Sequence, residues 1–229
     1  MSTSRITTIG PVLKVLARRY HGKSISASDR SVPFEILIST ILSARTRDET
    51  THCVAHALFS RYKTPRALAR ARTTDIQRVI HQIGFFRVKA QNILHTSQLL
   101  ISRHHGHVPR DTQSLMALPG VGRKTANIVR SLAFGVPAIA VDVHVHRISN
   151  RLGWITTRTP QQSETALLRI VPRAQWSTVN DVFVKFGKDV CRPITPQCWR
   201  CPIRRWCQYS IKTPRPAGKH TRNYARVLI

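Results

Sequence analysis

The chain has 229 residues, enough for one large domain or two modest ones that each bury a core. Lysine and arginine total 37 against ten acidic residues, which gives a formal net charge of +27 at pH 7. Charge of this size opposes compaction unless a polyanion is close, so nucleic acid is the leading partner. An anionic membrane is the competing partner, but no stretch approaches about 18 apolar residues, so we expect no transmembrane segment.

The first 28 residues contain no acid and are rich in Arg, Ser and Thr, as transit peptides are. Pro11, followed by Val12, Leu13 and Leu16, favours an ordinary helix that docks on the rest of the fold. We therefore expect a cytoplasmic, nucleoid-associated protein of a prokaryote, with organelle targeting left open.

The spacing of apolar residues is helical almost throughout, and no segment alternates strictly for four or more cycles, so the fold class is predicted to be all-α. Pro33 opens PFEILISTILSA, which is apolar on nearly all sides and predicts a central buried helix. The following helices are predicted at residues 48–62, at 75–83 with Thr73 or Thr74 as the cap, at about 87–103 and at 111–117. Further helices are predicted at 123–135, after Asp142, after Thr159 and at about 176–187.

The segment LPGVGRKTANIV, residues 118–129, joins a glycine-containing hairpin to the start of a helix. Gly120 and Gly122 allow backbone conformations closed to other residues and leave their N–H groups unshielded. Together with the helix N-terminus, these amides predict a phosphate-binding notch that ignores base sequence. A plain helix–helix connection is the alternative, and the net charge favours the phosphate site.

Lys124 lies one turn inside that helix, beside Arg123. Neighbouring positive charge, the helix dipole and partial burial disfavour the charged amine, and a neutral amine can attack a sugar carbon and form a Schiff base. From the residues alone, contact with phosphate is the simpler role, because most lysines of basic proteins have it.

Asp142 lies between Val141 and Val143, in the most apolar surroundings of the ten acidic residues. Buried carboxylates usually cap, pair or react. Capping of a helix that starts at Val143 is the first expectation. The carboxylate could also deprotonate a nucleophile and stabilise an oxocarbenium-like centre. We expect His144 and His146 to pack or to bond to the backbone.

Five cysteines are present, an odd number that argues against a secreted disulfide framework. Cys53 is alone in a helical pattern and is expected to be buried packing. The other four form a C-x6-C-x2-C-x5-C run, and thiolates this close need a metal to offset their repulsion. Structural zinc sites more often have two pairs separated by a longer loop, so a cubane iron–sulfur cluster is favoured over zinc. The four ligands would be Cys191, Cys198, Cys201 and Cys207.

In combination, these features resemble the endonuclease III family of helix-hairpin-helix DNA glycosylases. The resemblance rests on LPGVGRKTA, on VDVHVHR eighteen residues after the lysine and on the cysteine spacing. It extends to PFEILISTILSARTRDETT and IGFFRVKAQNI, and so covers about residues 30–207.

The resemblance implies two helical domains. Residues 26–136 would form a six-helix barrel domain with the helix-hairpin-helix motif at about 112–134. Residues 1–25 and 137–229 would form a second domain that holds a [4Fe-4S] cluster and ends in a basic tail. The active site would lie between them, with Lys124 on one wall and Asp142 on the other.

The resemblance also implies a bifunctional DNA N-glycosylase/AP lyase of base-excision repair that removes oxidised pyrimidines. Lys124 matches the nucleophile that attacks C1′ and forms an imine, and Asp142 matches the carboxylate that assists. One alternative is a G·T or G·U mismatch glycosylase, although related mismatch enzymes lack the lysine. The other is a non-catalytic iron–sulfur DNA-binding protein, against which Lys124 and Asp142 together argue.

The implied partner is double-stranded DNA with a damaged base or an abasic site, bound by a monomer. The target base must leave the stack, and the residues that match the gap-filling positions are Arg45 and Phe85. Bacterial members usually carry glutamine and often leucine there, so the opposite-base preference stays open, and core packing is an alternative for Phe85. The hairpin contacts to DNA would come from Leu118, Gly120, Gly122 and Arg123.

Overall fold

The computed structural model describes residues 6–20 and 33–216, and every regular element in these ranges is a helix, which confirms the all-α class. The α-helices are α2 (Ile9–Tyr20), α3 (Pro33–Ser43), α4 (Asp48–Arg61), α5 (Pro65–Ala69), α6 (Thr73–Ile80), α7 (Phe86–His104), α8 (Thr112–Met116), α9 (Arg123–Phe134), α10 (Val143–Arg151), α11 (Pro160–Ile170) and α12 (Trp176–Asp189). No helix within the described ranges is both long and apolar enough to cross a membrane.

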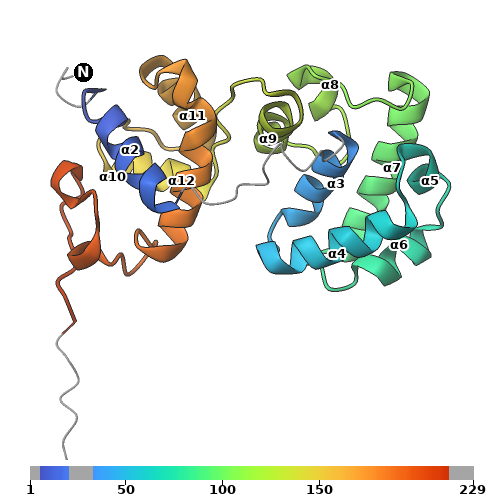
Figure 1. Cartoon of the computed structure of the whole chain (residues 1–229), viewed down its shortest axis with the longest axis horizontal. Helices are drawn as coiled ribbons and strands as arrows, with labels where there is room; N and C mark the ends of the chain where they lie inside the picture. Colours follow the sequence, from blue (N-terminus) through green and yellow to red (C-terminus); the bar gives the residue numbers. More distant parts are fainter. Residues whose placement is uncertain (1–5, 21–32, 217–229) are drawn as a thin grey trace, which may run out of the picture.

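Buried apolar side chains form two separate clusters, one in each half of the molecule (Figure 1). The first core consists of side chains from α3 to α9, between residues 34 and 129. The second core joins α2 to residues 139–203, and α2 lies directly against α12. The division at 26–136 stays a prediction, and its first boundary falls outside the described residues.

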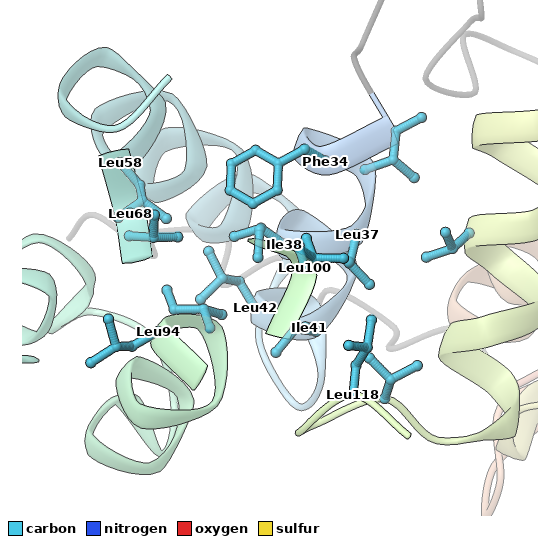
Figure 2. Packing of buried hydrophobic residues seen from close by; sticks show 14 of the residues in the cluster. Phe34, Leu37, Ile38, Ile41, Leu42, Leu58, Leu68, Leu94, Leu100 and Leu118 are labelled. Carbon is cyan, nitrogen blue, oxygen red and sulfur yellow. The ribbon is translucent and has the colours of Figure 1, made fainter. Parts of the chain in front are cut away.

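Helix α3 is the centre of the first core, as its composition predicts. Six of its eleven residues are buried, and they point to several sides of the helix: Phe34, Ile36, Leu37, Ile38, Ile41 and Leu42. Figure 2 shows five of them, all except Ile36, packed among apolar residues of α4, α5 and α7 and the hairpin residue Leu118. A helix buried on this many sides fixes the loop that follows it and gives the hairpin a rigid support.

Side-chain caps begin four of the described α-helices, at Thr64, Asp111, Asp142 and Thr159. The Thr159 side chain accepts a hydrogen bond from the N–H of Gln162 and forms a capping box at the start of α11. The predicted threonine cap of α6 is wrong, because this helix already begins at Thr73 and its N-cap is Arg72. The Arg72 guanidinium pairs with Asp75 at 2.8 Å, so an ion pair stabilises this end in place of a hydroxyl.

The expectation of a buried Cys53 is also wrong. Cys53 is exposed on α4, while Thr51, Val54, Ala55 and Leu58 form the buried stripe of that helix. The stripe occupies one side of a 3.6-residue period, and position 53 lies away from it.

Candidate active site

Lys124 and Asp142 come together from the two halves of the molecule. Lys124 lies in the first turn of α9, which packs its buried face in the first core, and Asp142 immediately precedes α10, which packs in the second core. The Lys124 Nζ lies 3.6 Å from the Asp142 Oδ2. The two residues are therefore within reach of one reacting atom.

The two carboxylate oxygens of Asp142 have different partners. Oδ1 accepts hydrogen bonds of 2.9 Å from the backbone N–H groups of His144 and Val145, which confirms the predicted N-cap of α10. Oδ2 is the oxygen that faces Lys124. The Asp142 side chain is 12% exposed and that of Lys124 is 46% exposed. A fixed carboxylate beside an accessible amine can take a proton from a nucleophile or stabilise developing positive charge.

The hairpin places Lys124 next to a tight turn that needs one of its two glycines. Gly120 has a φ of 78°, and a Cβ there would lie 3.0 Å from the Asn92 Nδ2 and 3.2 Å from the Ile41 Cγ2. Any larger residue would therefore meet both a strained backbone and α3 or α7. The Val121 N–H closes the turn by donating to the Leu118 carbonyl at 3.1 Å.

Two hairpin residues differ from what their sequence suggests. Gly122 has φ −90° and ψ 177°, a conformation open to any residue, so it is not required for backbone freedom. No atom lies within 4 Å of a Cβ built on Gly122, and its surroundings are open as an unshielded amide requires. Leu118 is 3% exposed and packs in the first core, and its N–H and carbonyl are bonded to Leu115 and Val121, so it supports the turn from inside.

Glu164 is a site residue that the sequence does not reveal. From α11, its Oε1 accepts a 2.9 Å hydrogen bond from the Asn127 Nδ2 and lies 3.6 Å from the Arg123 Nη1. Asn127 also donates to the Ile139 carbonyl at 3.0 Å. These contacts tie the first two turns of α9 to the second core, and so fix Lys124 relative to Asp142. The one sequence signal for Glu164 is that it is among only ten acidic residues in a strongly basic chain.

His144 lies beside the Asp142 cap and is partly buried. Burial lowers the pKa of its imidazole, and the positive charge of Arg147 acts in the same direction. The Arg147 Nη2 donates to the His144 Nδ1 at 3.1 Å and to the Cys191 carbonyl at 2.7 Å. Gly187 of α12 leaves room for the ring, since a Cβ there would lie 3.0 Å from the His144 Cγ.

Arg45 and Phe85 lie together on the surface of the first half. The Arg45 guanidinium is 5.6 Å from the centre of the Phe85 ring, which is a cation–π distance. Phe85 is 63% exposed, so core packing is not its role. Both residues have left-handed backbones, with φ of 56° for Arg45 and 59° for Phe85.

The four cysteines of the run surround one cavity in the second half. Arg151, apolar side chains at α10 and α12, and the loop residues Pro196, Ile203 and Tyr209 complete its lining, and its space is about 370 Å³ including the part continuous with solvent. The Arg151 Nη1 donates to the Cys191 Sγ at 3.4 Å. Burial raises the pKa of the Cys201 thiol to about 11, and neighbouring thiolates act in the same direction.

This donor set fits a group larger than one ion. Thiols with raised pKa need a cationic centre to become ligands. Within the described ranges, no group of three or more His, Cys, Asp or Glu side chains is arranged to hold a metal ion. The four thiols line one shared space, and four cysteines around one space are the donor set that a cubane of iron and sulfide uses.

The chain is similar to known DNA repair proteins over more than half of its length. The model of the HhH-GPD superfamily of base excision DNA repair proteins matches residues 38–173. Endonuclease III of Thermotoga maritima is 47% identical over 177 residues, which cover 77% of this chain and 83% of the relative. Endonuclease III of Bacillus subtilis is 42% identical over 183 residues, which cover 80% and 84%.

Among solved structures, a trapped covalent intermediate of endonuclease III with DNA matches with a TM-score of 0.82. It is 39% identical, and the match covers 91% of this chain and 97% of that one. The chain belongs to the endonuclease III family. Its activity is that of a bifunctional DNA glycosylase/AP lyase of base-excision repair.

Proposed function

We propose that Lys124 is the nucleophile of this activity and that Asp142 assists it. The observation that carries this proposal is the 3.6 Å approach of the Lys124 Nζ to the Asp142 Oδ2, beside the hairpin. Asp142 takes a proton from the amine, and the free amine attacks C1′ of the damaged nucleotide. The glycosidic bond breaks, and its electron pair leaves with the base, which is then protonated.

The second step cuts the strand. The C1′–O4′ bond opens, its electron pair stays on O4′, and O4′ takes the proton that the Lys124 nitrogen loses, which leaves a protonated imine between C1′ and that nitrogen. The imine makes the C2′ proton acidic, and loss of this proton expels the 3′ phosphate by β-elimination. Water hydrolyses the remaining imine and frees Lys124.

The substrate proposed is duplex DNA that carries an oxidised pyrimidine such as thymine glycol, or an abasic site. Arg45 and Phe85 would fill the space left by the extruded nucleotide, since both are exposed and adjacent. The backbone amides of Gly120 and Gly122 and the 52% exposed Arg123 would contact phosphates, while the predicted contact of Leu118 would be indirect, through its support of the turn.

We also propose that Cys191, Cys198, Cys201 and Cys207 hold a [4Fe-4S] cluster. The cluster would supply a rigid cationic centre that ties the cysteine-rich loop to α10 and α12. Purified protein should then contain about four iron atoms per chain and absorb near about 400 nm. Stoichiometric zinc without iron would overturn this assignment.

We also propose a two-domain division at 26–136 and 1–25 plus 137–229, a monomeric enzyme and a cytoplasmic, nucleoid-associated location in a prokaryote. In the basic tail, Lys212 and Arg215 are described, and the tail beyond residue 216 lies outside the described residues.

Borohydride trapping tests the Lys124 assignment directly. The wild-type protein, incubated with a thymine glycol duplex and sodium borohydride, should form a covalent adduct. Lys124→Gln should form none, while Lys63→Met, a loss of one exposed charge elsewhere, should trap normally. An adduct with Lys124→Gln would show that another amine is the nucleophile. A parallel panel with 5-hydroxycytosine, G·T and G·U duplexes identifies the lesion class.

A further inference from the structure

Lys89 is a buried cation that the proposed chemistry does not use. It lies on α7 and is 6% exposed. Its Nζ donates to the Leu42 carbonyl at 2.7 Å, to the Ala44 carbonyl at 2.5 Å and to the Thr46 Oγ1 at 3.2 Å. These three acceptors satisfy the three donors of an ammonium group.

The acceptors explain why a lysine is tolerated here without a carboxylate. They lie at the end of α3 and in the connection of residues 44–47, where helix carbonyls lack intrahelical partners and favour positive charge. In the described ranges Lys89 forms no ion pair with an acid within 4 Å. Burial lowers its pKa, as desolvation does for any ammonium.

The same lysine contacts both loops that carry the exposed pair. Arg45 lies between Ala44 and Thr46, two of the three residues that bind the ammonium. Phe85 is one turn before Lys89, and the Lys89 N–H donates to the Phe85 carbonyl at 3.0 Å. The two loops also touch directly, since a Cβ on Gly84 would lie 3.3 Å from the Arg45 carbonyl oxygen.

The backbone of the pair needs such a support. Left-handed φ values are uncommon for residues other than glycine, and they persist where the surroundings determine them. Arg45 and Phe85 both have them, and both side chains point into solvent, where packing alone cannot hold them. The Lys89 side chain links α7, which begins directly after Phe85, to the backbone on both sides of Arg45.

We propose that Lys89 is a positioning residue that holds Arg45 and Phe85 as one stacked unit, ready to enter the duplex as the target base leaves it. This inference rests on the proposed gap-filling role of Arg45 and Phe85. It explains why the backbones of Arg45 and Phe85 keep their left-handed conformations, and it gives the buried Lys89 a role in the step in which the target base leaves the duplex.

The perturbation is Lys89→Met, which keeps the apolar stem and removes the three donors. Excision from a thymine glycol duplex under single-turnover conditions should slow by about 10- to 100-fold, the range that a misplacement of about 1 Å causes. Borohydride trapping on a single-stranded oligonucleotide with an abasic site should be unchanged, because no base has to leave a stack. Lys63→Met is the matched control and should behave as wild type in both assays.

A double-mutant test separates positioning from a general structural effect. If Lys89 acts through the pair, Lys89→Met should slow excision no further in an Arg45→Ala/Phe85→Ala background. An equal slowing in both backgrounds, an equal loss of single-stranded trapping, or wild-type excision by Lys89→Met would overturn the inference.

Folding and the underlying proposal are checked separately. Circular dichroism reports whether Lys89→Met folds. If it does not, Thr46→Val, which removes the acceptor at 3.2 Å, should slow duplex excision alone, and wild-type behaviour of Thr46→Val would then overturn the inference. If the Arg45→Ala/Phe85→Ala variant excises at the wild-type rate, the proposed gap-filling role of the pair is refuted. This outcome does not depend on any result with Lys89 variants.

Discussion

The two oxygens of Asp142 allow its structural and chemical roles to be separated by substitution. Asp142→Asn keeps an acceptor for the His144 and Val145 N–H groups, and asparagine is as good an N-cap as aspartate. Its unfolding free energy should change by less than about 0.5 kcal/mol. Asp142→Ala loses both hydrogen bonds and should cost about 1–2 kcal/mol. In a chain of this size, each kcal/mol corresponds to about 2–4 °C in Tm.

Catalytic activity should depend on Oδ2, the oxygen that faces Lys124. Both variants remove the carboxylate that lies 3.6 Å from the Lys124 Nζ, and neither side chain accepts a proton near neutral pH. Loss of a positioned general base typically slows a reaction by about 10²- to 10⁴-fold. The rate of base excision should therefore fall in this range for both variants, although only Asp142→Ala is destabilised.

The measurement combines single-turnover excision of thymine glycol with thermal unfolding followed by circular dichroism. Assays well below the Tm of each variant exclude unfolding as the cause of a slow rate. An Asp142→Asn protein that excises at nearly the wild-type rate would refute the role of the carboxylate. Equal destabilisation of the two variants would refute the assignment of the cap to Oδ1.

Three further outcomes are expected. Gly120→Ala should lower the unfolding free energy by about 1–3 kcal/mol, because φ is 78° and the new Cβ meets Asn92. Gly122→Ala should change the unfolding free energy by less than about 0.5 kcal/mol. Urea unfolding measures both variants, and equal effects would contradict the geometry of the hairpin. The pKa of His144 is lower in the folded protein than in the unfolded chain, so the unfolded chain takes up a proton first as pH falls below about 6.5. Stability should therefore fall between about pH 7 and pH 5, and less so in His144→Gln; identical pH profiles would refute this. Affinity for duplex DNA should weaken at least about 100-fold between about 50 and 200 mM salt, since each phosphate contact releases counterions. An affinity that does not change with salt would exclude phosphate contacts as the main source of binding.

The sequence by itself determined the features that depend on neighbouring residues. The all-α class follows from apolar periodicity, and α3 is buried on most sides because apolar residues occupy all of it except one narrow polar stripe. The caps at Asp142 and Thr159 follow from hydrogen bonds to backbone groups two or three residues away. The motif residues also sufficed to indicate the family, because they combine a turn, a helix start and a cysteine spacing.

Only the tertiary structure decided which of these groups meet. Local patterns did not predict that Glu164 would bind α9, that Lys89 would join the loops of Arg45 and Phe85, or that Cys53 would face solvent. The approach of Lys124 to Asp142 was expected from a resemblance, and its 3.6 Å distance depends on how α9 and α10 pack in two different cores. Contacts between distant residues are set by the packing of whole helices, and helix propensity carries no information about them.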